Sequence, residues 1–156
     1  PEHLEYKAFA EEPLIVLAPL DSIWNTPREL LASYPFIRFD RNQWVGQSID
    51  NWLRKEGVQV NDLMELDTIE SVSNMVYYNL GVTIVPQPCV APPNPLPLKR
   101  VPLGPSAPKR VLGLLTRRDS PKARLVNVLF DQLALLVEME RIKHQPQQLQ
   151  NEVRSS

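Results

Sequence analysis

Two polar stretches carry the side chains best suited to binding chemistry, and each directly follows an apolar run. Residues 40–47 follow Phe36–Phe39, and residues 67–70 follow Leu63–Leu66. In open α/β sheets, ligands bind beyond the carboxyl ends of the strands. The sequence therefore predicts a ligand-binding site formed by these two loops. The candidate residues are Arg41, Asn42, Gln43, Trp44, Gln47, Thr68, Ile69 and Glu70.

The types of these side chains favour recognition of a small polar molecule. Arg41 could hold a carboxylate in bidentate geometry, although a solvated surface arginine is an equal alternative. Trp44 could stack on an aromatic ligand or anchor its own loop. A helix start at Thr68 would offer free N–H groups to an anion. Because Asp67 and Glu70 would compete for those donors, we expect Thr68 to donate to a polar group that need not be anionic.

No motif in the sequence indicates catalysis or a bound cofactor. There is no phosphate-binding glycine loop, no Gly-x-Ser-x-Gly elbow and no cluster with metal-ligand spacing. The single cysteine, Cys89, has its possible partners His3 and His144 near the two chain ends, so we expect an inert, partly buried thiol. Capping or solvation is the expected role of four carboxylates, Asp40, Asp50, Asp67 and Glu70. We therefore expect a protein that is not an enzyme and has no cofactor.

Charge and hydropathy limit the partners and the location. The net charge of −1 supplies no basic field for nucleic acid. The start, Pro1–Glu5, lacks the pattern of a signal peptide, and no apolar run reaches membrane-spanning length. One cysteine among 156 residues fits a reducing cytosol. We expect a cytoplasmic protein with no membrane contact, and the missing initiator Met suggests part of a longer protein.

Four apolar runs in the first 86 residues read as buried strands separated by helices. The runs are Leu14–Ala18, Phe36–Phe39, Leu63–Leu66 and Val82–Val85. The first helix should start at a capping box formed by Thr26 and Glu29, with Pro27 in its first turn. The second carries Val45, Ile49, Trp52 and Leu53 at helical spacing and should stop at Gly57.

A third helix should begin at a second capping box, Asp67–Glu70, and end at Gly81. Its apolar stripe consists of Ile69, Val72, Val76 and Leu80. Strict alternation of apolar strands and helices predicts a mainly parallel sheet covered on both faces.

Fewer helices and strands are predicted in the second half of the chain. Residues 86–108 hold nine of the 16 prolines and should form a surface connection with one edge strand, Leu98–Val101. Val111–Thr116 reads as a buried strand, and Ser120-Pro121 should start a long helix. The polar residues 144–156 read as a disordered tail. The last helix needs a sheet to cover, which suggests two lobes joined by two strands, with much of the first lobe encoded upstream of Pro1.

Several segments in one order resemble the effector-binding domain of LysR-type transcriptional regulators over about residues 4–140. They are Glu12–Pro19, Phe36–Phe39, Ile49–Leu53, Leu66–Val72 and Asn79–Pro86. The resemblance implies an α/β, type 2 periplasmic-binding-protein-like fold. Residues 1–18 and 112–143 would be parts of the first subdomain, and residues 19–111 the second. In that family the loops matching 41–47 and 68–70 line the cleft for a small-molecule inducer.

The resemblance also implies a function and partners. The chain would sense an inducer, which the chemistry of Arg41 and Trp44 suggests is a carboxylate or an aromatic acid. Promoter DNA would be bound only through an N-terminal domain absent from this chain, in a homodimer or homotetramer. Two alternatives stay open: an extracytoplasmic solute-binding protein of the same fold, and a dimerisation module without a ligand.

Overall fold

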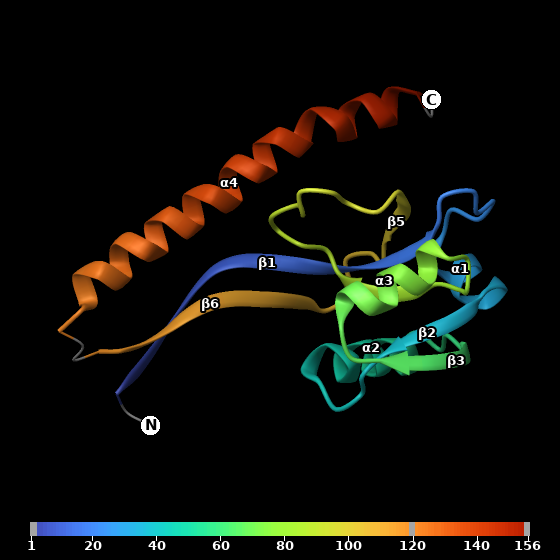
Figure 1. Cartoon of the computed structure of the whole chain (residues 1–156), viewed down its shortest axis with the longest axis horizontal. Coiled ribbons are helices and arrows are strands. Elements are labelled where there is room, and N and C mark those ends of the chain that lie inside the picture. Colours follow the sequence, from blue (N-terminus) through green and yellow to red (C-terminus); the bar gives the residue numbers. More distant parts are fainter. Residues whose placement is uncertain (1–2, 119–120, 155–156) are drawn as a thin grey trace. The chain divides into compact units, whose positions relative to one another are not determined.

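The computed structural model describes residues 3–118 and 121–154, with side chains described as far as residue 143. The elements follow one another as shown in Figure 1. They are β1 (Leu4–Pro19), α1 (Pro27–Ser33), β2 (Pro35–Phe39), α2 (Trp44–Lys55), β3 (Asn61–Leu66), α3 (Ile69–Tyr77), β4 (Thr83–Pro86), β5 (Leu98–Pro102), β6 (Lys109–Arg117) and α4 (Ala123–Arg154).

The chain divides into two compact units. The larger unit comprises Pro13–Gln87 and Asn94–Arg110, and the smaller unit comprises Pro1–Glu12, Pro88–Pro93 and Val111–Ser156. The long strand β1 contributes residues to both. The subdomain boundary expected at residue 18 lies six residues further along the same strand than the division after Glu12, because the apolar run Leu14–Ala18 is only part of β1.

The sheet of the larger unit is mixed, and the expectation of a mainly parallel sheet was wrong. β1 pairs antiparallel with β4 and with β5, whereas β2 pairs parallel with β3. A parallel bridge between Phe36 and Val82 joins the two sets of strands. The alternation of strands and helices correctly indicated the parallel part. It did not indicate that β1 pairs antiparallel with β4 and β5, because that pairing joins strands that are far apart along the chain.

The core of the larger unit comes from the expected apolar runs and helix faces. Phe36, Ile37 and Ile84 on the strands are almost fully buried, as are Val72 and Val76 on α3. α2 and α3 both contact β2 and β4. Packing these apolar faces fixes the positions of the strand ends and helix starts that carry the candidate ligand residues.

The helix ends show one confirmed cap and one corrected cap. At α1, the Thr26 side chain accepts from the Glu29 N–H, and the Glu29 carboxylate accepts from the Thr26 N–H, both at 3.3 Å. At α3, the expected Asp67–Glu70 capping box does not form, because Thr68 is the N-cap and bonds to Ser71. The reason is that Thr68 already has the extended backbone of a cap, one residue later than expected.

The end of α3 also differs from expectation. The helix stops at Tyr77, and Asn79 adopts a left-handed conformation with φ of 60°. Leu80, expected on the buried stripe, is therefore 42% exposed. Gly81 has another role, since a Cβ there would lie 2.2 Å from the carbonyl oxygen of Pro35. Gly81 permits close packing of this segment beside β2.

In the smaller unit, β6 pairs with β1, and α4 is the longest helix. Gly113 lies against Tyr6 and Lys7, and the Arg118 N–H donates to the His3 carbonyl at 2.9 Å. β6 was expected to be buried, but its residues are half-buried or exposed, with Leu115 at 65%. The reason is that pairing with β1 satisfies one edge of β6 and does not cover its two faces.

The helix α4 extends to Arg154 and so includes most of the segment expected to be a disordered tail. Its expected start at Ser120 lies outside the described residues. Several large apolar side chains of α4 are exposed, among them Leu125 and Ile142. Across the described residues, no helix combines the length and the apolar character needed to cross a membrane.

Candidate functional site

The two predicted ligand loops lie side by side at the carboxyl ends of β2 and β3. The parallel register pairs Phe39 with Leu66, so both strands end at the same level. The Asp40 N–H donates to the Leu66 carbonyl at 2.9 Å, and the Gln43 side-chain amide donates to the Asp67 carbonyl at 2.9 Å. That the two loops lie together at the strand ends was therefore predicted correctly from the sequence.

The turn after β2 is organised around the carboxylate of Asp40. It accepts hydrogen bonds from the Asn42 N–H at 2.8 Å, from the Asn42 side-chain amide at 3.0 Å and from that of Gln43 at 3.4 Å. The backbone bond from Asn42 is the main cause that lowers the pKa of Asp40 from its usual 3.8. Asp40 thus caps a turn, as expected of it, and orients the first half of the loop.

The second half of the loop continues directly into α2. Gln43 is the N-cap but makes no side-chain capping bond, since its amide is directed to Asp67 and Asp40. A Cβ at Gly46 would lie 2.0 Å from the Asp40 carbonyl oxygen. Only glycine lets the first turn of α2 approach the loop this closely. Trp44 and Gln47, in the same turn, are both exposed.

The other loop presents the start of α3. The Thr68 hydroxyl accepts from the Ser71 N–H at 3.0 Å and donates to the Ser71 hydroxyl at 2.7 Å. The Thr68 hydroxyl therefore caps the helix, and its expected donation to a ligand stays a prediction. Ile69 is half-buried and Glu70 is exposed.

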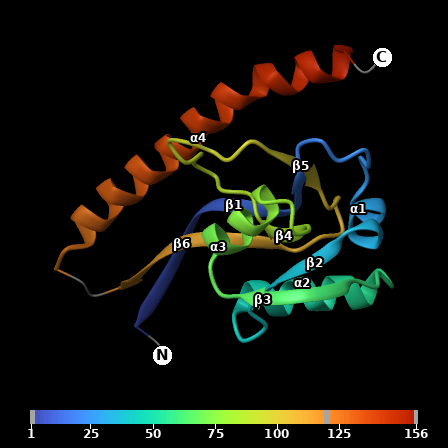
Figure 2. The same cartoon turned by 45° about the vertical axis from the view of Figure 1, so that its right-hand side comes forward.

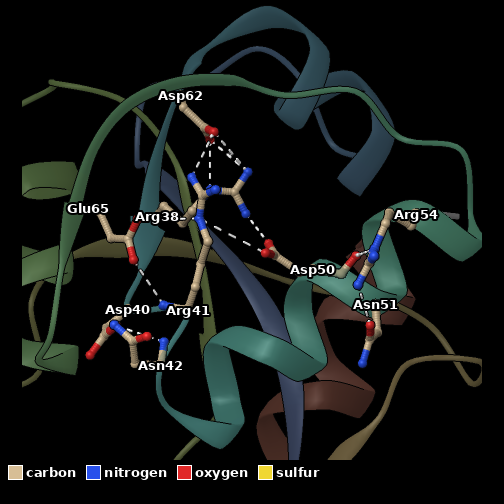
Figure 3. A network of polar contacts seen from close by, with 9 residues as sticks. All are labelled: Arg38, Asp40, Arg41, Asn42, Asp50, Asn51, Arg54, Asp62 and Glu65. Carbon is tan, nitrogen blue, oxygen red and sulfur yellow. Dashed lines mark hydrogen bonds and ion pairs between the residues drawn. The ribbon is translucent and has the colours of Figure 1, made fainter.

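Arg41 is surrounded by carboxylates of its own chain, as Figure 3 shows. Its Nε atom lies 3.3 Å from Glu65 Oε2, and its Nη2 atom lies 3.3 Å from Asp62 Oδ2. The backbone N–H of Arg41 donates to Glu65 Oε1 at 2.9 Å. The Arg41 side chain is 50% exposed. The guanidinium of Arg41 is thus half exposed and is already paired with carboxylates of its own chain.

Beside Arg41 lies a second, buried arginine, Arg38, which is not among the eight candidate residues. The Arg38 side chain is only 9% exposed, and its guanidinium contacts Asp50 on α2 and both oxygens of Asp62 on β3. It also lies over the ring of Phe36, 5.2 Å from the ring centre. Asp50 was expected to cap a helix or to be solvated, and this was wrong, because it pairs with Arg38.

The sequence does contain a sign that Arg38 is buried and paired. Arg38 stands in an apolar strand, and a buried charge needs a paired partner. Asp62 and Glu65 occupy β3 at positions that the parallel register brings opposite Phe36 and Arg38. The register was not readable from the sequence, so the carboxylates could not be assigned to the arginines.

The predicted residues lie on open surface of the larger unit. A shallow depression of about 510 Å³ is lined by Arg38, Asp50 and Arg54. Another of about 280 Å³ lies beside Trp52. Neither includes any of the eight candidate residues. Among the side chains of residues 3–118 and 121–143, no group of three His, Cys, Asp or Glu could hold a metal ion.

Cys89 belongs to the smaller unit. Its N–H donates to the buried Glu12 carboxylate at 3.0 Å. Burial, with the negative charge of Glu12, raises the pKa of the Cys89 thiol above its usual 9.0. This protonated thiol agrees with the expectation of an inert, partly buried cysteine.

Comparison with known sequences identifies related regulators. The profile described as LysR substrate binding domain matches residues 1–136. A curated relative, the HTH-type transcriptional regulator SoxR of Arthrobacter sp. (strain TE1826), is 29% identical over 91 residues, which are 58% of this chain and 30% of the relative. The chain thus matches less than a third of the length of that regulator.

Comparison with solved structures establishes the fold. The regulatory domain of CcmR from Synechocystis PCC6803, in complex with 2-PG, has a TM-score of 0.66 and 20% identity over 88% of this chain and 69% of that chain. HinK, a LysR family transcriptional regulator from Pseudomonas aeruginosa, has a TM-score of 0.66 and 17% identity over 87% of this chain and 50% of that chain. The fold is the expected α/β, type 2 periplasmic-binding-protein-like fold.

Proposed function

This chain belongs to the LysR substrate-binding domain family, and we propose that it senses a small-molecule inducer for a DNA-binding transcriptional regulator. The observation that carries the proposal is the convergence of the two loops after β2 and β3, joined by Gln43 and Asp67. Carboxyl ends of neighbouring parallel strands are the usual ligand position in open α/β sheets. A net charge of −1 favours assigning DNA contact to another domain of the regulator.

We assign the ligand to the surface formed by the eight candidate residues. The exposed indole of Trp44 can stack on a ring, and the amides of Asn42, Gln43 and Gln47 can bond polar groups. Arg41 is the candidate partner for a ligand carboxylate. A carboxylate or an aromatic acid is therefore the ligand class that we propose.

Sensing requires that the ligand bind one arrangement of the regulator better than another. A ligand resting on both loops would couple the start of α2 to the start of α3. We further propose that the regulator acts in the cytoplasm as a homodimer or homotetramer. That the curated relatives are transcriptional regulators favours this function over an extracytoplasmic solute-binding protein.

The three tryptophans allow a direct test by ¹H–¹⁵N NMR on the 156-residue chain. Trp44 is 54% exposed at the candidate site, whereas Trp52 is buried. Trp24 belongs to the segment 20–26, which Figures 1 and 2 place at the opposite end of the larger unit from the loop 40–43. Trp44→Phe and Trp24→Phe, each of which removes one of the three indole signals, would assign all three.

The probes are benzoate, benzamide, shikimate and 2-PG, titrated separately. At least one should shift the Trp44 indole signal saturably while the Trp24 signal stays in place. If all four leave Trp44 unshifted, or shift only Trp24, the proposed site is wrong.

A further inference from the structure

Glu65 holds Arg41 in the way that a bound carboxylate ligand would. One of its oxygens accepts from the Arg41 N–H at 2.9 Å, and the other lies 3.3 Å from Arg41 Nε. Figure 3 shows the side chain of Glu65 directed at the loop that carries Arg41. Both carboxylate oxygens thus bind a single residue, through its backbone and through its guanidinium.

This contact is exposed enough to exchange with a ligand. The Arg41 and Glu65 side chains are 50% and 40% exposed. Exposed ion pairs contribute little net free energy, so water or another anion can replace one partner. Because Glu65 is tethered on β3, its effective concentration near Arg41 is high. A free carboxylate must therefore compete with an internal one.

The neighbouring arginine cannot take over this role. Arg38 is buried and already holds Asp50 and Asp62. The two arginines face three carboxylates, Asp50, Asp62 and Glu65, so the cluster carries one excess negative charge. A ligand carboxylate arriving at Arg41 adds another negative charge unless Glu65 moves away.

We propose that Glu65 is a specificity-determining residue that lowers the affinity of the site for anionic ligands by occupying Arg41. This proposal rests on the proposed function. A ligand with a carboxylate binds by exchanging with Glu65 at Arg41, whereas a neutral ligand of the same shape binds beside the intact pair. Glu65 thereby sets how strongly the site distinguishes an acid from its amide.

The test compares benzoate with benzamide, which share size and ring but differ in charge. Both are titrated into the wild-type chain and into Glu65→Gln, with the Trp44 indole signal as readout. Glutamine keeps an oxygen that can accept from the Arg41 N–H, so the loop should remain in place. The matched control is Glu56→Gln, which removes the carboxylate from the Arg28–Glu56 ion pair of the larger unit, whose side chains are 63% and 26% exposed.

Glu65→Gln should tighten benzoate binding about fivefold, the ratio that corresponds to the upper value for an exposed ion pair. Its affinity for benzamide should stay within about twofold of the wild-type value, the scatter allowed for distant sites. Glu56→Gln should change neither affinity. Equal gains for both probes, an unchanged or weaker benzoate affinity, or no benzoate binding by Glu65→Gln would each overturn the role of Glu65.

The same titrations separate this proposal from the proposed function. If a probe shifts Trp44 in the wild-type chain but Glu65→Gln gives no selective gain for benzoate, the site stands and Glu65 does not set its specificity. If none of the four probes shifts Trp44 in the wild-type chain while Glu65→Gln binds benzoate, Glu65 does compete with a carboxylate for Arg41. The natural ligand would then bind at another site.

Discussion

The side-chain amide of Gln43 donates a hydrogen bond of 2.9 Å to the backbone carbonyl of Asp67. These residues belong to different loops and are 24 positions apart. Gln43 ends the loop after β2 and is the N-cap of α2, while Asp67 immediately precedes the N-cap of α3. The bond thus connects the starts of the two helices between which we place the ligand.

Replacing Gln43 with Ala should loosen both loops with little effect on the core. A typical hydrogen bond contributes about 1 kcal/mol, so the free energy of unfolding should fall by about that amount. Hydrogen exchange should become faster in residues 40–44 and 67–69. The exposed Gln59, after α2, is the control, and Gln59→Ala should change neither quantity. Unchanged exchange in Gln43→Ala would mean that the bond does not hold the loops together.

The side chain of Thr68 should contribute more to the stability of the fold than a side chain that only contacts a ligand. Its side chain caps α3 through the Ser71 N–H, and loss of such a cap costs about 1 kcal/mol. Thr68→Ala should lower the free energy of unfolding by about that amount, and Thr68→Ser should keep most of it. Urea denaturation measures both. A Thr68→Ala protein as stable as the wild type would show that the cap contributes nothing.

The buried Arg38 should be one of the most sensitive positions in the larger unit. Its removal leaves Asp50 and Asp62 without the guanidinium that they share. Breaking a buried pair costs about 3–5 kcal/mol, but these carboxylates are 25% and 41% exposed, so we expect about 2 kcal/mol for Arg38→Met.

A second substitution isolates the ion pair. In Arg38→Met/Asp62→Asn, one of the two carboxylates that lose Arg38 is no longer charged, so the double variant should be more stable than the sum of the two single changes predicts. Strict additivity in urea denaturation would contradict the coupling between Arg38 and Asp62.

Much of the larger unit could be predicted because local signals and burial agreed there. The capping box at Thr26, the stripe behind Val45 and the stop at Gly57 depend only on neighbouring residues, and all appear in the structure. The two ligand loops could also be paired, since consecutive parallel strands end at the same edge of a sheet.

What could not be predicted depended on contacts between distant residues. The antiparallel pairing of β1 and the register of β2 with β3 are set by packing, so the sequence could not show that Asp62 and Glu65 meet Arg38 and Arg41. Within the candidate site, the surroundings of Arg41 are therefore what the sequence predicted least well. A candidate carboxylate receptor turned out to hold carboxylates of its own chain.

Gly46 and Gly57 should respond differently to alanine. A Cβ at Gly46 would meet the Asp40 carbonyl, and backbone cannot yield as a flexible side chain would. We expect Gly46→Ala to cost about 3 kcal/mol, the upper part of the range for overpacking, and to displace the loop. Gly57 has φ of 63° but open space, so Gly57→Ala should cost about 1 kcal/mol, the strain of a side chain in the left-handed conformation. Equal losses in urea denaturation would mean that the close approach at Gly46 is not tight.

Asp40 should make the stability of the larger unit depend on pH in acid. The folded protein lowers the pKa of Asp40 below 3.8, chiefly through the Asn42 N–H. A lowered carboxyl pKa stabilises the folded state fully above the unfolded pKa, and this stabilisation is lost as pH falls through the folded pKa.

Asp40→Asn removes the charge and should lower the free energy of unfolding. This deficit relative to the wild type should be constant from pH 7 to about pH 5 and should shrink below about pH 4. Urea denaturation at each pH measures the deficit, and a carboxyl NMR titration measures the pKa directly. A midpoint at or above 3.8 for Asp40, or a deficit that does not change with pH, would show that the turn does not favour the ionised carboxylate.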